Sequence, residues 1–251
     1  MYPILFKKGT HFPFPFSQMR TLKNLFLISF FTLLSASAFS QSSENLGWLF
    51  ITHTQKLSKK LDALADVQVG SSNNFIHFEN LLLRGGVGYN LNKKHSIAAG
   101  YTYTGEWTEE DGKITYNPEH WISQQYVFNT NIKRTEITLR FRQEQRFIKE
   151  EGNFNFSQRS RAFFRIQIPL AANATFTHGL YSSMQNEIFI NVQHKEKVNK
   201  SFFDQNIPFI SIGYRWNKKI DTEIGYIPWV EREPKRNVFS NVYQCIITTE
   251  L

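Results

Sequence analysis

Charged or hydroxyl side chains occupy every even-numbered position in the segment RTEITLRFRQEQRF, residues 134–147. They are Arg134, Glu136, Thr138, Arg140, Arg142, Glu144 and Arg146. The planar fork of an arginine side chain can hold a carboxylate through two parallel hydrogen bonds. Arginines and acids at this spacing could therefore bind one another in an ionic network, or the arginines could attract an anionic solute.

Two later segments carry similar charges. Arg161 and Arg165 lie in residues 158–170, and Glu187 lies in residues 181–193. If these segments are neighbouring strands, their charged side chains can meet those of residues 134–147. We refer to the following predicted set as the charge network: Arg140, Arg142, Glu144, Arg146, Arg161, Arg165 and Glu187.

Residue types that commonly carry catalysis or bind metals show no recognisable pattern. The histidines after residue 41 are His53, His77, His95, His120, His178 and His194. No Gly-x-Ser-x-Gly motif of a serine hydrolase accompanies them. Cys245 is the only cysteine, which excludes an intramolecular disulfide and the cysteine patterns of zinc sites. We therefore predict no catalytic residue, no metal and no cofactor.

The charge balance argues against nucleic acid as a partner. The formal net charge is +8, but four basic residues and no acidic ones precede residue 41. The remainder keeps 25 of the 29 basic residues against 21 acidic ones, a net charge of +4. An excess this small, spread over some two hundred residues, is not the basic surface that nucleic-acid binding requires.

The N-terminal region has the composition of a secretory signal peptide. A basic start at Met19 is followed by an apolar run over residues 25–34 and then by small residues. The run is much shorter than the roughly 20 residues of a transmembrane helix. The predicted organisation has three parts: residues 1–18 are an overextended start, residues 19–40 are a signal peptide cleaved near Ser40/Gln41, and residues 41–251 form one exported domain.

The segment around residues 134–147 alternates with period two. Ile137, Leu139 and Phe141 take odd positions, so apolar and charged side chains lie on opposite faces of a strand. This strand is about fourteen residues long, whereas strands of soluble sheets typically have about five or six. With ten similar segments, the candidate strands span residues 48–55, 61–70, 76–91, 95–107, 119–130, 134–148, 158–170, 181–193, 202–216, 219–230 and 238–250.

Two architectures fit such strands, a soluble sandwich and a transmembrane barrel. The length of the strands favours the barrel, and so does a polar face rich in arginine and glycine. No segment after residue 41 could form a transmembrane helix, and a closed barrel is the other structure that satisfies its backbone in lipid. We predict an all-β fold, a transmembrane antiparallel up-and-down β-barrel of about 10–12 strands. Because bacterial single-chain barrels have even strand numbers, we expect 10 or 12.

The connections differ in length in a way that is typical of outer-membrane barrels. Short ones are predicted at Asn92–Lys94, Asn131–Lys133 and Asn217–Lys218. Long polar ones are predicted at Thr108–Pro118, Lys149–Ser157, His194–Lys200 and Glu231–Asn237. Residues 88–101 (GYNLNKKHSIAAGY) and 213–226 (GYRWNKKIDTEIGY) share Gly-Tyr, Asn-Lys-Lys and Gly-Tyr at the same spacing, which predicts two similar hairpins.

Several segments together resemble a known family. GWLFITHTQKLSKKLDALADVQVG, LLLRGGVGYNLNKKHSIAAGYTY, LRFRQEQRF, RSRAFFRIQIPL and NEIFIN are similar to the domain-of-unknown-function 2490 family (DUF2490) of small outer-membrane β-barrel proteins of Gram-negative bacteria. The resemblance covers nearly all of residues 41–251. It implies location in the bacterial outer membrane and no established activity. The chain departs from such barrels at its end, IITTEL, where an aromatic residue is usual.

Three functions are compatible with the predicted charge network inside a barrel. The first is a structural ionic core that fills the lumen, because small barrels are filled by side chains. The second is a narrow porin-like channel for small anionic or polar solutes. The third and weakest is an outer-membrane lipid-modifying enzyme. We expect no enzymatic activity, and we expect outer-membrane lipid and the barrel assembly machinery as partners, with the solute unspecified.

Overall fold

The computed structural model describes residues 44–72, 75–110, 112–150 and 152–251. The predicted overextended start (1–18) and signal peptide (19–40) lie outside these residues. In the part that is described, no helix combines the length and the apolar character needed to cross a membrane. The helical content of these residues is one short 3-10 helix, η1 (Lys195–Lys197).

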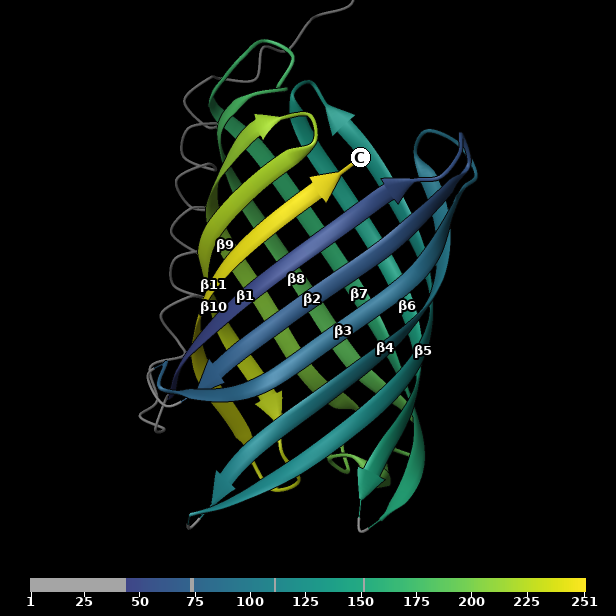
Figure 1. Cartoon of the computed structure of the whole chain (residues 1–251), viewed down its shortest axis with the longest axis vertical. Helices are drawn as coiled ribbons and strands as arrows, with labels where there is room; N and C mark the ends of the chain where they lie inside the picture. The colour runs from purple at the N-terminus through teal and green to yellow at the C-terminus, as the bar shows by residue number, and fades with distance from the viewer. Residues whose placement is uncertain (1–43, 73–74, 111, 151) are drawn as a thin grey trace, which may run out of the picture. The chain divides into compact units, whose positions relative to one another are not determined.

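The described residues form eleven strands that close into a single barrel (Figure 1). Each strand pairs with its neighbours in sequence order, and the all-β barrel architecture is confirmed. The strands are β1 (Glu44–Lys56), β2 (Leu61–Ser72), β3 (His77–Asn90), β4 (His95–Glu110), β5 (Lys113–Ile132), β6 (Thr135–Glu150), β7 (Asn153–Ala172), β8 (Gly179–Gln193), β9 (Phe203–Asn217), β10 (Ile220–Arg232) and β11 (Asn237–Glu250).

The strand count corrects one expectation. Each of the eleven candidate strands corresponds to a strand of the barrel, so the expectation of 10 or 12 is wrong for the described residues. In an antiparallel meander with an odd number of strands, the first and last strands run in the same direction. β1 and β11 therefore pair in parallel, from Glu44 opposite Ser240 to Thr54 opposite Glu250. A parallel ladder also satisfies the backbone groups of both edges, so closure does not require an even number.

Two of the predicted long loops are strand instead. β4 and β5 pair as far as Glu110 opposite Lys113, and β6 and β7 pair as far as Glu150 opposite Asn153. The predictions at Thr108–Pro118 and Lys149–Ser157 are therefore wrong. Residues that favour strands follow both turns, namely Ile114 and Tyr116, and Phe154 and Phe156. A glycine with positive φ, Gly112 (φ 74°) or Gly152 (φ 85°), allows a tight turn before them.

The turns of the two hairpins in the internal repeat share one hydrogen bond. In the β3–β4 hairpin, Oδ1 of Asn92 accepts a hydrogen bond from the backbone N–H of Lys94 at 2.9 Å. In the β9–β10 hairpin, Oδ1 of Asn217 accepts the corresponding bond from Lys219 at 2.7 Å. An asparagine side chain that bonds the backbone two residues later stabilises a tight turn. The repeated Asn-Lys-Lys sequence thus forms the same bond twice, although residues 91–94 separate β3 from β4 and only residues 218–219 separate β9 from β10.

Successive turns lie at alternating ends of the barrel. We call the end where β1 and β11 finish the C-terminal end; there Lys56 forms an ion pair with Glu250. Every turn from an odd-numbered to an even-numbered strand lies at this end (Figure 1). The other end holds the β4–β5 and β6–β7 extensions and the η1 segment.

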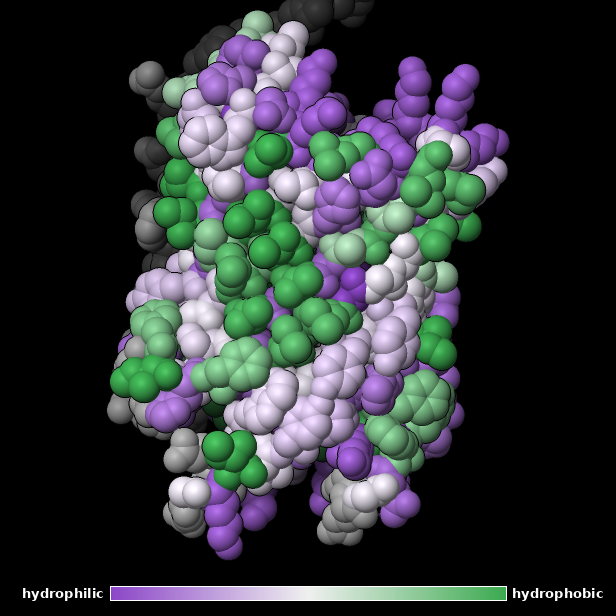
Figure 2. All heavy atoms as spheres, in the orientation of Figure 1, coloured by the Kyte–Doolittle hydropathy of each residue, from purple (hydrophilic) through white to green (hydrophobic). Residues whose placement is uncertain are grey.

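The outer surface of the barrel is largely apolar between its two ends. Figure 2 shows apolar side chains gathered across the middle of the visible face and hydrophilic ones toward its upper end. The exposed apolar side chains include Leu49, Ile51, Leu83, Val87, Ile97, Ile122, Leu139, Phe141, Phe164, Ile168, Ile188, Ile210, Ile212 and Ile224. Exposed apolar surface on this scale is unusual for a soluble monomer.

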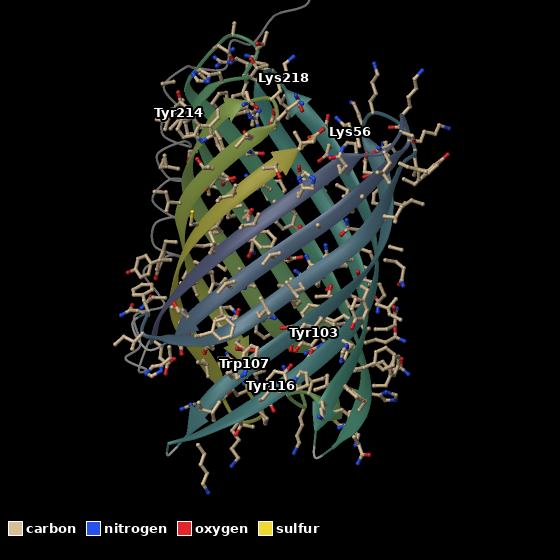
Figure 3. The ribbon with its side chains drawn as sticks, viewed as in Figure 1. Lys56, Tyr103, Trp107, Tyr116, Tyr214 and Lys218 are labelled. Carbon is tan, nitrogen blue, oxygen red and sulfur yellow. The ribbon has the colours of Figure 1, made fainter. Side chains whose placement is uncertain are left out.

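Aromatic side chains lie toward both ends of the outer surface. Tyr214 lies toward the C-terminal end, and its ring packs 4.8 Å from that of Trp216 (Figure 3). Tyr103, Trp107 and Tyr116 lie toward the other end, where the rings of Trp107 and Tyr116 are 4.9 Å apart. Aromatic rings flanking an apolar band on both sides are characteristic of barrels in membranes.

Two glycines allow β3 and β4 to approach closely on the interior side. Gly86 and Gly100 lie opposite each other in the ladder. A Cβ on Gly86 would lie 2.8 Å from the carbonyl oxygen of Ala99, and a Cβ on Gly100 would lie 2.8 Å from that of Gly85. These distances are shorter than van der Waals contact, so this approach requires glycine at both positions.

Gly86→Ala should lower the free energy of unfolding by about 1–3 kcal/mol, the usual cost of overpacking. The new methyl group would press on the backbone of β4. Gly85→Ala is the matched control, because a Cβ at that position meets no atom within 4 Å. Urea unfolding of the protein refolded in detergent measures both variants. Equal effects at the two neighbouring positions would contradict the close approach of the strands.

Candidate functional site

The interior side of β6 is charged, and its outer side is apolar from Ile137 to Phe141. Arg142, Glu144 and Arg146 are each at most 6% exposed, whereas Leu139 and Phe141 are 43% and 53% exposed. Successive side chains of a strand point to opposite faces, so the even-numbered positions all face the interior. The alternation in the sequence thus places the charged side chains of β6 in the interior of the barrel.

Glu144 lies at the centre of these charges and is fully buried. Its Oε2 accepts a hydrogen bond from Nε of Arg159 at 2.8 Å, and its Oε1 accepts one from Nη1 of Arg161 at 2.7 Å. The register of β6 and β7 places Glu144 directly opposite Arg159. One carboxylate therefore neutralises part of the charge of two arginines on the neighbouring strand.

Glu187 extends the cluster to β8. Both of its oxygens accept hydrogen bonds from Arg161, at 2.9 and 2.7 Å, in the bidentate geometry that arginine favours. Nη2 of Arg140 donates a third bond to Glu187 at 2.9 Å. Because Arg161 binds both Glu144 and Glu187, the ion pairs are continuous across β6, β7 and β8.

Asp204 and Glu119 continue the cluster away from the C-terminal end. Nη1 of Arg159 donates to Asp204 at 2.9 Å, and Nη2 of Arg146 donates to Glu119 at 2.9 Å. Asp204 also accepts bonds from the side chains of Asn191 and Asn199 at 3.2 and 3.0 Å. These contacts link β5, β6, β7, β8 and β9 through polar side chains alone.

Aromatic rings fill the space beside the arginines. The guanidinium carbon of Arg159 lies 4.8 Å from the ring centre of Trp121 and 5.0 Å from that of Phe189. The guanidinium carbon of Arg161 lies 4.1 Å from the ring of Phe189. Contacts between a cation and a ring face become stronger when both are removed from water, as they are here.

A second group of ion pairs lies nearer the C-terminal end. Glu223 of β10 pairs with Arg165 and accepts hydrogen bonds from the hydroxyl groups of Tyr181 at 3.0 Å and Ser211 at 2.7 Å. Arg215 pairs with Glu136 and Asp221, both at 2.9 Å.

A loop residue closes the interior over this second group. Phe176, from the connection between β7 and β8, is only 4% exposed. Its ring centre lies 4.1 Å from the guanidinium carbon of Arg215, and its carbonyl oxygen accepts a hydrogen bond from the same side chain at 2.9 Å. Its ring also packs 5.7 Å from Tyr181. The C-terminal end of the interior is therefore covered on the β7–β10 side.

One part of the interior is apolar, which the sequence did not predict. The buried side chains there come from β1, β9, β10 and β11: Leu46, Trp48, Phe209, Ile227, Val242 and Ile246. Trp229 packs edge-on against Trp48, with ring centres 5.2 Å apart. Strands with apolar residues on both faces do not show the alternation that identified β6, so the interior is only partly polar.

The structure brings most of the predicted charge network together. One set of contacts joins Arg140, Arg142, Glu144, Arg161 and Glu187. Arg146 lies at its edge, since it is linked to the set through Asp204 and Arg159. Arg165 does not join it and pairs instead with Glu223. Two more residues of the observed cluster could have been predicted from alternation, because residues two apart on a strand face the same side. They are Arg159, two residues before Arg161, and Glu119, two residues before the buried Trp121.

Asp204 could not have been found from alternation. Gln205 pairs with Phe189 and Phe203 pairs with Ile190, which leaves Asp204 as an extra residue on β9. Such a β-bulge changes which side chains face inward. As a result both Asp204 and Phe209, an even and an odd position, are buried in the interior.

The described residues contain no group of three or more histidine, cysteine or acidic side chains placed to hold a metal ion. Several histidines bond instead to hydroxyl groups. Nδ1 of His95 lies 2.5 Å from the hydroxyl oxygen of Tyr126, and Nδ1 of His120 lies 2.5 Å from that of Tyr101.

Glu144→Gln should destabilise the protein by about 3–5 kcal/mol, because it leaves two buried guanidinium groups short of a carboxylate. Glu233→Gln is the control, since it removes the same charge from an exposed pair with Arg236 and should cost at most about 1 kcal/mol. Unfolding midpoints in urea give both values. A cost below about 1 kcal/mol for Glu144→Gln would mean that water fills the interior and screens its charges.

Comparisons with known proteins give one result. No curated protein and no solved structure matches the chain. The sequence model of a family described as "Protein of unknown function (DUF2490)" matches residues 45–240, which takes in β1 to β10 and the start of β11. The match covers more than half of the chain, as the resemblance of its segments suggested. The chain therefore belongs to the DUF2490 family.

Proposed function

We propose that this chain is an outer-membrane protein whose barrel is closed by its own side chains and has a structural role rather than a transport role. The observation that carries the proposal is the buried cluster around Glu144, in which Arg159 and Arg161 connect β6 to β8 and β9. The channel and enzyme alternatives lack a comparable observation in their favour.

The outer surface supports the membrane part of the proposal. Exposed apolar side chains around a closed sheet are compatible with the hydrocarbon core of a bilayer. The closed sheet also has no edge strand whose unpaired backbone groups would be left without hydrogen bonds in lipid. Tyr214 toward one end and Trp107 toward the other suit the two headgroup regions. In this setting the partners are outer-membrane lipid and the machinery that inserts barrels.

The side chains packed in two parts of the interior support the structural part. A passing ion would have to separate Arg159 from two carboxylates and move it from between two rings. On the β1 and β9–β11 side it would meet the packed apolar side chains around Trp48 and Phe209. Side chains occupy both routes, whereas a porin-like channel requires a water-filled path.

Leu139→Arg tests the membrane-facing surface. An arginine near the middle of the bilayer costs about 2–4 kcal/mol on the lipid side of a barrel, so folding into vesicles should be impaired. Leu139→Met is the control, because it keeps the volume and the apolar character of the side chain. Folding is followed by the heat-dependent shift of the band on gels. If both variants fold into lipid equally well, the assignment of this surface is incorrect.

A planar-bilayer recording tests the closed interior. The refolded parent protein should give no single-channel steps, while a general porin inserted by the same procedure supplies the positive control. Separation of inner and outer membranes should place the protein in the outer-membrane fraction. Steady conductance of the parent would reject the structural role in favour of the channel. Recovery in the soluble periplasmic fraction would reject the membrane location.

A further inference from the structure

The interior of the barrel is not filled everywhere. A cavity of about 190 Å³ lies on the inner side of β1–β6. Its polar lining includes Asp66, Arg84, Ser123, Gln125, Arg140 and Arg142. It is smaller than the roughly 300 Å³ or more of typical pockets for drug-sized ligands, so an occupant would be an ion or a very small molecule.

Small side chains on β3 and β4 create this space. Gly86, Ala98 and Gly100 all line the cavity, and none has a side chain larger than a methyl group. Arg140 and Arg142 of β6 therefore border an opening in the packing on their β3–β4 side. The charge network is closely packed toward β7 and β8 and open toward β3 and β4.

The charges around the cavity do not balance. The connected ion pairs include five arginines: Arg140, Arg142, Arg146, Arg159 and Arg161. They include four acids: Glu119, Glu144, Glu187 and Asp204. Arg84 and Asp66, which pair at 2.8 Å, add no net charge. Within these ion pairs the arginines therefore outnumber the carboxylates by one.

The excess charge lies on Arg142. Its side chain is only 4% exposed, and its Nε and Nη2 both donate to the neutral Oε1 of Gln125, at 3.0 and 2.6 Å. Its Nη1 makes no hydrogen bond and lies 3.9 Å from Oε1 of Glu144, a carboxylate that already binds Arg159 and Arg161. A buried guanidinium without its own carboxylate is costly.

We propose that the cavity binds a small oxoanion of the size of phosphate, with Arg142 as its principal ligand and Arg84 and Arg140 beside it. Oxoanions present several acceptor oxygens, which suits the forked donors of arginine. Nε of Arg140 is also buried without a hydrogen-bond partner, so a second donor is free. The inference goes beyond the structural role proposed above and does not depend on conduction through the barrel.

Titration of the detergent-refolded parent protein with inorganic phosphate tests the site. We expect saturable binding, seen as exchange broadening of the phosphate ³¹P resonance and as a rise in the unfolding temperature. Arg142→Gln should weaken binding by about tenfold or more, the value of one lost charge-assisted hydrogen bond or more. Arg236→Gln makes the same change in net charge on the exposed β10–β11 turn and should bind phosphate like the parent protein.

A second variant keeps every charge and fills the space. Ala98→Leu should abolish phosphate binding because its larger side chain occupies the cavity. It also decides the question if Arg142→Gln fails to fold. The proposal is overturned if the parent shows no saturable binding, if Arg142→Gln and Arg236→Gln bind equally, or if Ala98→Leu binds like the parent. None of these outcomes bears on conductance, so the structural role stands or falls separately.

Discussion

A closed sheet of eleven strands encloses more space than small side chains can fill, and any charge placed inside it needs a partner. Glu144 meets this requirement, because it is fully buried and is held by Arg159 and Arg161. The charges on β6 are compensated because Arg159 and Arg161 of β7 pair with Glu144, and Glu187 of β8 pairs with Arg140. Trp121 and Phe189 then fill the space that the ion pairs leave.

The interior combines two kinds of packing that meet on β9. Toward β5–β8 it is held by ion pairs, and toward β1, β10 and β11 it is held by apolar contacts. The bulge at Asp204 allows β9 to serve both, since it turns an acid toward Arg159 and, five residues later, Phe209 toward the apolar side chains. A strand without the bulge would bury one of these residues and expose the other.

Much of the fold could be predicted because the alternation of polar and apolar residues indicates which side of a strand faces the barrel interior and which faces outward. Arg142 and Leu139 are assigned to opposite faces by this rule, and the structure places them so. The rule fails where both faces are apolar, as around Trp48, and where a bulge shifts the pattern, as at Asp204. The sequence also did not identify which charged side chains pair with each other, because the register of a strand depends on its neighbouring strand as well. Arg165 pairs with Glu223, fifty-eight residues away, rather than with Glu187.

The parallel pairing of β1 with β11 has a consequence for the path of the chain. Glu44 lies level with Ser240, and Glu250 lies level with Thr54, so the barrel begins at one rim and finishes at the other. The two points are separated by ten residues of strand, roughly 33 Å. A short peptide therefore cannot join the start of β1 to the end of β11, and circular permutation of the barrel would need a linker that runs the length of the β1–β11 ladder. Epitopes placed just before β1 and just after β11 would be displayed on opposite sides of any bilayer that holds the barrel.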